Sequence, residues 1–308
     1  MSVLDAIGHT PLVELRRLVP EDAARVVLKL EFANPTGSMK DRFALAAIAA
    51  AERDGRLRPG GTVVEYTGGT TGVSLAFICA ARGYRSRIVF SDAFSQDKGL
   101  MMQALGSEVT VVPSGGGGIT EQVVRRMIEE ARALAAQPGH WWCDQLNNRD
   151  ALHGYVPMGE ELAQQAGRVD AFVQVVGTAH SIHGASAGLR QGGRTVHVVA
   201  VEPAETPVLS GGKPGSHGID GIGIGFVPPL WERDRVDELM TVSTAEAKAM
   251  ARRLASEEGI FAGTSTGANV VAALRVARRL GPGSTVATIA IDSGLRYLST
   301  DLFRGAPA

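Results

Sequence analysis

The chain has 308 residues, with 44% hydrophobic residues and 31 Lys+Arg against 32 Asp+Glu. This composition excludes a disordered chain, and the length exceeds the ~250 residues at which one core stops growing, so we expect two domains. The balanced charge offers no basic surface, so we expect no nucleic-acid and no membrane partner. No apolar run approaches the ~18 residues of a membrane span and the N-terminal sequence lacks a signal-peptide pattern, which favours a cytoplasmic protein.

Strand-like and helix-like segments alternate along the chain. We expect strands at 25–31, 62–66, 87–91 and 108–113, separated by helices at 40–54, 74–83, 96–106 and about 119–136. Further strands at 171–177, 195–202 and 285–292 alternate with helices at about 151–166, from 181, at 244–258 and at 267–280. Apolar strands without clean alternation, separated by helices, are typical of parallel sheets covered on both faces. We therefore predict an α/β fold with two doubly wound, mainly parallel sheet domains and the active site between them.

Lysine is rare in this sequence, and one lysine stands out. Lys40 lies in the turn sequence NPTGSMKDR at 34–42, directly before an apolar helix. The positive end of a helix dipole disfavours the ammonium form, as a nucleophilic or basic lysine requires. An exposed lysine in a first helical turn is the alternative. We expect solvated charges at the other four lysines, which are Lys29, Lys98, Lys213 and Lys248.

Two glycine-rich loops are suited to bind anions. The sequence YTGGTTG at 66–72 and the sequence VVGTAHSIHG at 175–184 each follow a predicted strand and precede a predicted helix. Backbone N–H groups of the second loop, with the hydroxyls of Thr178 and Ser181, would hold a phosphate, and the first loop would hold a carboxylate. Each loop alone is equally consistent with an ordinary strand-to-helix turn. Together, in opposite domains, they indicate a bipartite ligand.

A metal site is not expected. His180 and His183 lie three residues apart, a spacing open to metal ligation on one helical turn, but no Cys, Asp or Glu nearby completes a ligand set.

Eight motifs, in order along nearly the whole chain, carry a family resemblance. They are IGHTPLVEL at 7–15, NPTGSMKDR at 34–42, TGGTTG at 67–72, QLNN at 145–148, GTAHSIHG at 177–184, GIGIGFVP at 221–228, EGIFAGTSTGAN at 258–269 and DSGLRYLST at 292–300. In this order they resemble the cysteine synthase group of fold-type II pyridoxal-phosphate enzymes, which includes O-acetylserine sulfhydrylases and cystathionine β-synthase cores.

The resemblance implies a role for each site residue. Lys40 would carry pyridoxal 5'-phosphate through its amine and act as the base on the substrate Cα proton. Cofactor contacts would come from Thr70, Gly177, Thr178, Ala179, His180, Ser181, Gly223 and Ser293, with the Ser293 hydroxyl at the pyridine nitrogen. The substrate would be held by Thr67, Gly68, Gly69, Thr71 and Gln145. Residues 36–145 would form a smaller, mobile domain that contains the substrate loop. Residues 1–35 and 146–308 would together form a larger domain that contains the phosphate loop. A homodimer is expected.

Several positions depart from the family pattern. The substrate loop has Tyr66, Gly68 and Thr70 where the family has Pro, Ser and Asn, so we expect a pocket unlike that of a housekeeping sulfhydrylase. In the phosphate loop, Ala179 and His180 replace two glycines, and His180 would place an imidazole beside the phosphate. Asp292, next to Ser293, would face the pyridine nitrogen if the chain were shifted by one residue.

These features favour a β-replacement on an activated L-serine, with a small-molecule nucleophile as second substrate. O-acetyl-L-serine and sulfide, giving L-cysteine and acetate, are the first expectation. A specialised β-substituted alanine synthase that uses O-phosphoserine or serine with ammonia, homocysteine or another nucleophile is one alternative. A serine or threonine deaminase and a non-catalytic homologue that binds a partner are two others.

Overall fold

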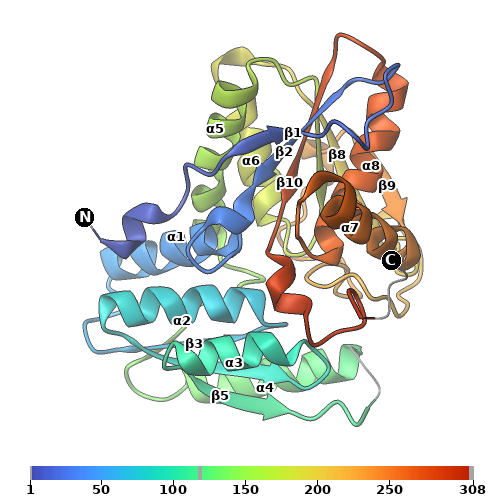
Figure 1. Ribbon diagram of the computed structural model, residues 1–308. Coiled ribbons are helices and arrows are strands. Elements are labelled where there is room, and N and C mark those ends of the chain that lie inside the picture. The colour runs from blue at the N-terminus through green and yellow to red at the C-terminus, as the bar shows by residue number, and fades with distance from the viewer. Residues whose placement is uncertain (1, 117–119, 305–308) are drawn as a thin grey trace.

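Two β-sheets of unequal size organise the molecule (Figure 1). The computed structural model describes residues 2–116 and 120–304. The larger sheet has six strands in the order β1-β2-β10-β7-β8-β9, and the smaller has four in the order β5-β4-β3-β6. Neighbouring strands are parallel except at β1, which pairs antiparallel with β2. The predicted α/β fold with two mainly parallel sheets is confirmed.

The elements follow in the alternating order expected for parallel sheets. The strands are β1 (Leu12–Glu14), β2 (Arg25–Leu30), β3 (Thr62–Tyr66), β4 (Arg85–Ser91), β5 (Glu108–Val112), β6 (His140–Trp142), β7 (Ala171–Val175), β8 (His197–Pro203), β9 (Glu238–Val242) and β10 (Thr285–Ala290). The helices are α1 (Lys40–Arg53), α2 (Thr70–Arg82), α3 (Gln96–Ala104), α4 (Glu121–Ala135), α5 (Val156–Ala166), α6 (His180–Arg190), α7 (Thr244–Glu258) and α8 (Thr264–Leu280). Residue 119, where the sequence predicts the start of α4, lies outside the described residues.

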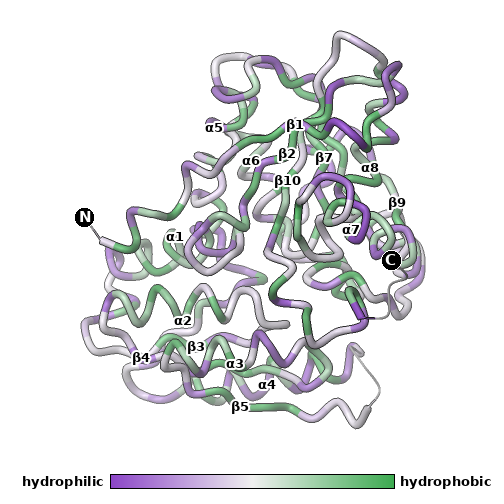
Figure 2. The backbone as a smooth tube through the Cα atoms, in the orientation of Figure 1, coloured by the Kyte–Doolittle hydropathy of each residue, from purple (hydrophilic) through white to green (hydrophobic). Residues whose placement is uncertain are grey.

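Alternate residues of the smaller sheet face two separate apolar clusters. Val64 and Val89 pack with Val123 and Met127 of α4, whereas Ile88, the neighbour of Val89, packs with side chains of α2 and α3. Because successive strand residues point to opposite faces, helices cover this sheet on both sides. Figure 2 shows hydrophobic and hydrophilic residues following one another along the helices, as expected for helices with one buried side.

In the larger sheet, paired helices lie on opposite sides of the strands (Figure 1). Helix α5 packs against α6, and α7 against α8. A Cβ atom at Gly159 would lie 2.0 Å from the carbonyl oxygen of Ala185, and one at Gly188 would lie 2.1 Å from that of Val156. Glycine at both positions therefore lets α5 and α6 approach backbone to backbone.

The structure differs from the sequence-based prediction at three short strands and one helix. Strands β1, β6 and β9 were not predicted; two have three residues each and β9 has partly exposed side chains. Residues 149–155 form a 3₁₀ helix instead of the first turns of α5, which begins at Val156 with Pro157 in its first turn. The smaller sheet spans residues 62–142, and the predicted domain limits at 36 and 145 remain a prediction.

Two lysines expected to be solvated are buried, so that prediction is wrong for Lys29 and Lys98. The side chain of Lys29 is 0% exposed and its ammonium lies 2.7 Å from Glu161. Glu161 also accepts two hydrogen bonds of 2.8 Å from Arg42, whose guanidinium donates two more of 2.8 Å to the buried Glu31. Two cations and two carboxylates thus join β2, α1 and α5 in one buried network.

No helix among the described residues is long and apolar enough to cross a membrane.

Candidate active site

The loops that follow the carboxyl ends of the strands meet between the two sheets. In the smaller sheet the loops after β3, β4 and β6 begin at residues 67, 92 and 143, and in the larger sheet the loops after β7 and β10 begin at 176 and 291. Ligands of open α/β sheets bind at this end of the strands. Two adjoining cavities lie there, and ten of the predicted site residues line them: Lys40, Thr67, Gly68, Thr70, Thr71, Gln145, Gly177, Thr178, Ser181 and Gly223.

Lys40 is the first residue of α1 and lines both cavities. Burial lowers the pKa of its amine to about 8 from 10.5, and the nearby Glu65, whose own pKa burial raises to about 8, opposes this shift when it is ionised. The amine lies 5.3 Å from the centre of the Phe43 ring. A substantial fraction of the amine is therefore neutral near physiological pH, which a nucleophile or base needs. The alternative of a surface lysine is excluded.

The first anion loop lies between β3 and α2 and is fixed by hydrogen bonds. The backbone N–H of Gly69 donates to the Thr67 hydroxyl (3.0 Å), and the Thr71 hydroxyl donates to the side-chain oxygen of Gln145 (2.8 Å). The amide nitrogen of Gln145 donates in turn to the Tyr66 carbonyl (2.7 Å). The structure thus brings together residues that are 74 apart in sequence, as the resemblance implies.

A second lysine in the wall of this site was not predicted from the sequence. Lys98 is 2% exposed, and its ammonium donates to Asp220 over 2.8 Å and lies 4.6 Å from the centre of the Tyr297 ring. Its aliphatic stem supports the loop, since a Cβ at Gly69 would lie 2.5 Å from the Lys98 Cδ. Gly69 also has φ +118°, so glycine is required there for both conformation and space.

The second anion loop runs from Gly177 into the N-terminus of α6. Ala179 adopts a left-handed conformation with φ +69°, and α6 begins at His180. A Cβ at Gly177 would lie 2.5 Å from the carbonyl oxygen of Gly221, so this loop packs directly on the next one. The first N–H groups of a helix have no partner within the helix, and Thr178 and Ser181 beside the start of α6 line the cavities, so this helix N-terminus is suited to bind an anion.

The position of His180 corrects the expectation of an imidazole beside the phosphate. The ring is 1% exposed, and burial lowers its pKa to about 3, so it is neutral. Its Nε2 lies 2.8 Å from the carbonyl oxygen of Asn148 and must donate, which leaves Nδ1 to accept from the Thr178 hydroxyl at 2.8 Å. The Thr178 proton is thereby committed to His180.

Ser181 keeps a free donor. The side-chain amide of Gln174 donates to the Ser181 oxygen over 3.2 Å, so the hydroxyl proton of Ser181 remains available. The donors left for an anion are therefore this hydroxyl and the backbone N–H groups.

Ser293 does not line either cavity. It caps a short 3₁₀ helix by accepting from the Leu295 N–H at 3.3 Å. The smaller of the two cavities, called the inner cavity below, is lined by Ser265 in the first turn of α8. Ser265 is 2% exposed, and its hydroxyl makes no hydrogen bond to any described residue. Sequence reasoning missed Ser265, although it lies in the motif EGIFAGTSTGAN that was recognised.

Asp292 also lines the inner cavity, and only one of its two carboxyl oxygens is hydrogen-bonded within the described part of the chain. Burial raises its pKa, and one oxygen accepts a hydrogen bond of 2.7 Å from Tyr297 while the other has no partner among the described residues.

The two histidines of the α6 turn do not converge on a common point. His183 accepts from the backbone N–H of Glu232 (3.1 Å), whereas His180 contacts Asn148. No group of three or more His, Cys, Asp or Glu side chains that could hold a metal occurs within residues 2–116 and 120–304.

Comparisons with known proteins agree with this geometry. The family model described as pyridoxal-phosphate dependent enzyme matches residues 3–292. The chain is 40% identical over 305 residues to a cysteine synthase of Staphylococcus aureus, covering 98% of this chain and 96% of that protein. A crystal structure of O-ureido-L-serine synthase has a TM-score of 0.90 at 38% identity, covering 99% of this chain and 96% of the other. That of a cysteine synthase from Entamoeba histolytica has a TM-score of 0.89 at 34% identity, covering 100% and 91%.

The chain therefore belongs to the family of pyridoxal-phosphate-dependent enzymes. Within that family it is of the cysteine synthase type.

The site fits pyridoxal phosphate on its own geometry. A buried amine of lowered pKa, a helix N-terminus with free donors and an unpaired Ser265 hydroxyl lie along one continuous pair of cavities. These groups match an aldehyde, a phosphate and a ring nitrogen, respectively.

Proposed function

We propose that the enzyme catalyses β-replacement on O-acetyl-L-serine with sulfide, giving L-cysteine and acetate. The observation that carries this proposal is the partly neutral Lys40 amine between two anion loops. Relatives named cysteine synthase support it.

Each residue has a distinct part in this reaction. The bound cofactor supplies an electron sink that acidifies the substrate Cα proton. Lys40 holds the cofactor, takes this proton and later returns it. The Thr67 hydroxyl and the N–H groups of the loop bind the substrate carboxylate, and Thr71 holds this loop to Gln145. Ser181 and the start of α6 bind the phosphate, and Ser265 contacts the pyridine nitrogen through a neutral hydroxyl.

Water is the main competitor of the nucleophile. In a deaminase of this fold, no nucleophile adds and hydrolysis releases ammonia. The apolar side chains that line the cavity, including Met127, Ile222 and Phe226, limit the access of water and favour replacement. Retention of Lys40 and of both loops argues against a non-catalytic homologue.

The test is an absorption spectrum of the purified protein with and without O-acetyl-L-serine, followed by sulfide. We expect a visible band of lysine-bound cofactor that changes with O-acetyl-L-serine and returns when sulfide is added. Lys40→Ala should lack the band. A wild-type band that O-acetyl-L-serine leaves unchanged, or a band retained by Lys40→Ala, would contradict the proposal. Ammonia release in place of cysteine would favour the deaminase.

We also propose a homodimer. Leu100 of α3 and the adjacent Leu295 and Leu298 are 64%, 63% and 50% exposed, which supports an apolar contact surface there. Light scattering of the wild type and of Leu295→Glu tests this: a monomeric wild type would contradict it.

A further inference from the structure

Gly68 in the substrate loop is explained by a neighbouring side chain. Its backbone does not have the positive φ that favours glycine, in contrast to Gly69. A Cβ at Gly68 would lie 2.9, 3.2 and 3.3 Å from three ring atoms of Phe94. These distances are shorter than ordinary van der Waals contact, so the Phe94 ring occupies the place of a side chain at position 68.

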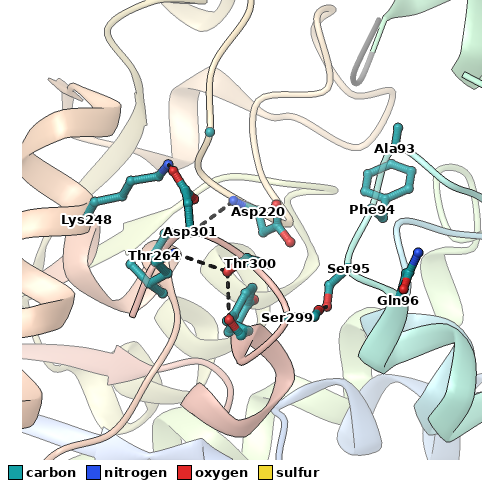
Figure 3. A pocket seen from close by; sticks show the side chains of 13 residues that line it. Ala93, Phe94, Ser95, Gln96, Asp220, Lys248, Thr264, Ser299, Thr300 and Asp301 are labelled. Atoms are coloured by element: carbon teal, nitrogen blue, oxygen red, sulfur yellow. Dashed lines mark hydrogen bonds and ion pairs between the residues drawn. The ribbon is translucent and has the colours of Figure 1, made fainter. Parts of the chain in front are cut away.

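Phe94 lies where two cavities meet. It belongs to the loop between β4 and α3, and its ring lies 5.9 Å from that of Phe90. One cavity contains Lys40 and the substrate loop, and the other is an outer polar pocket of about 390 Å³. Figure 3 shows the Phe94 ring at the edge of this outer pocket, on the side opposite Lys248. The ring therefore forms part of the wall of both cavities.

The same wall of the Lys40 cavity is apolar over most of its extent. Helix α4 contributes Val124 and Met127, and the loop after β8 contributes four large apolar side chains. The apolar residues that line this cavity are Tyr66, Phe94, Val124, Met127, Leu146, Ile219, Ile222, Ile224 and Phe226. Sulfide carries no carbon and gains nothing from such a surface, whereas an alkyl or aryl group is stabilised on leaving water.

We propose that Phe94 is a specificity-determining residue that fits the site to a nucleophile with an apolar group, of the class of alkyl or aryl thiols. This inference rests on the proposed β-replacement and goes beyond it, because it adds thiols with an apolar group to sulfide as second substrates. The contact of Phe94 with Gly68 places the ring directly against the loop that binds the amino-acid substrate.

The reaction with such a thiol is balanced without an added reactant. The bond between Cβ and the ester oxygen of O-acetyl-L-serine breaks, and its electron pair leaves with acetate. A bond forms between Cβ and the thiol sulfur, and the thiol proton goes to solvent. The products are an S-substituted L-cysteine, acetate and a proton, with no change in oxidation state overall.

A series of thiols tests the specificity. With O-acetyl-L-serine saturating, kcat/KM is measured for sulfide, ethanethiol, propanethiol and butanethiol. It is also measured for 2-mercaptoethanol, which has the size of propanethiol but ends in a hydroxyl group. Each value is calculated from the concentration of the ionised nucleophile. We expect a rise of about fourfold for each methylene that is buried, and a lower value for 2-mercaptoethanol than for propanethiol. In Phe94→Ala, the ratio of propanethiol to sulfide should fall about tenfold, the factor for about 1.4 kcal/mol of lost apolar contact.

Two further variants control this measurement. Phe94→Leu keeps an apolar side chain and should retain most of the ratio. Phe303 pairs with Phe261 at 4.6 Å and lines neither cavity, so Phe303→Ala should leave the ratio unchanged. A flat thiol series, or the same ratio in Phe94→Ala as in the wild type, would overturn the proposal. A wild type that turns over neither sulfide nor any thiol would contradict the proposed function instead.

The steric part is tested on the protein without cofactor. Gly68→Ala should lower Tm by on the order of 5 °C, because the new methyl group meets the Phe94 ring. The decrease in Tm caused by Gly68→Ala should be smaller when Phe94 is also replaced by Ala. Gly99→Ala is the matched control, because its Cβ would make only an ordinary contact of 3.4 Å with Phe90. Equal stability of Gly68→Ala and the wild type would show that the ring does not fill this place.

Discussion

Replacing Glu161 by Gln tests whether the buried charge network holds α1, and with it Lys40, in position. Glu161 accepts hydrogen bonds of 2.8 Å from two nitrogens of Arg42 and lies 2.7 Å from the Lys29 ammonium. These cations lower its pKa to about 2 from 4.5, although burial opposes the shift. This lowering of the pKa corresponds to about 3 kcal/mol in the free energy of unfolding at neutral pH. Since Glu161→Gln leaves one cation of the network unpaired, a loss of about 3–5 kcal/mol is expected.

The assay is urea unfolding of the variant and the wild type between pH 3 and pH 8, followed by circular dichroism. Because the folded pKa of Glu161 is depressed, its contribution is complete above about pH 5 and is lost as the pH falls toward 2. The wild type should therefore lose stability in acid faster than Glu161→Gln. Glu14→Gln is the control, because Glu14 pairs with Arg25 at 3.8 Å on the surface. Its substitution should change the free energy of unfolding by less than ~1 kcal/mol. A loss below about 1 kcal/mol in Glu161→Gln at pH 7 would refute the reasoning.

Three further predictions concern the site. The charge of Glu65 raises the pKa of Lys40, so Glu65→Gln should move the midpoint of cofactor loading, measured from visible absorbance against pH, below about 8; an unchanged or higher midpoint would contradict this. Ser265→Ala should shift the spectrum of the bound cofactor, and Ser293→Ala should leave it unchanged. The reverse result would show that Ser293, and not Ser265, contacts the pyridine nitrogen. Gly69→Ala, strained at φ +118°, should raise KM for the amino-acid substrate at least ~10-fold with a lower Tm, and wild-type values of both would exclude the close contact at this loop.

Periodicity and strand-ending glycines were sufficient to predict the architecture and the positions of both glycine-rich loops. Helix α1 follows from its alanine-rich composition, and β3, β7 and β8 from their β-branched runs, because these local preferences agree with the fold. Strands β1 and β6 are too short to show a period, and they exist because a long strand beside them offers free hydrogen-bonding groups.

The errors at single residues have a common cause. The carboxylates that pair with Lys29 and Lys98 are far away in sequence: they belong to Glu161 and Asp220, which only the fold brings within 3 Å. Ser265 and Ser293 lie in adjacent motifs, and the direction in which α8 enters the core decides which hydroxyl reaches the cavity. The sequence alone shows neither which carboxylate pairs with each lysine nor how α8 is oriented in the core.

The order of strands has a consequence for the synthesis of the protein on the ribosome. The smaller sheet is complete once residue 142 has been made, whereas β2 waits for its parallel neighbour β10 at 285–290. Until then, one edge of β2 and one of β7 remain unpaired, and both strands are apolar. We therefore expect the nascent chain to carry a finished smaller sheet while the larger one stays open, and chains truncated before residue 285 to aggregate.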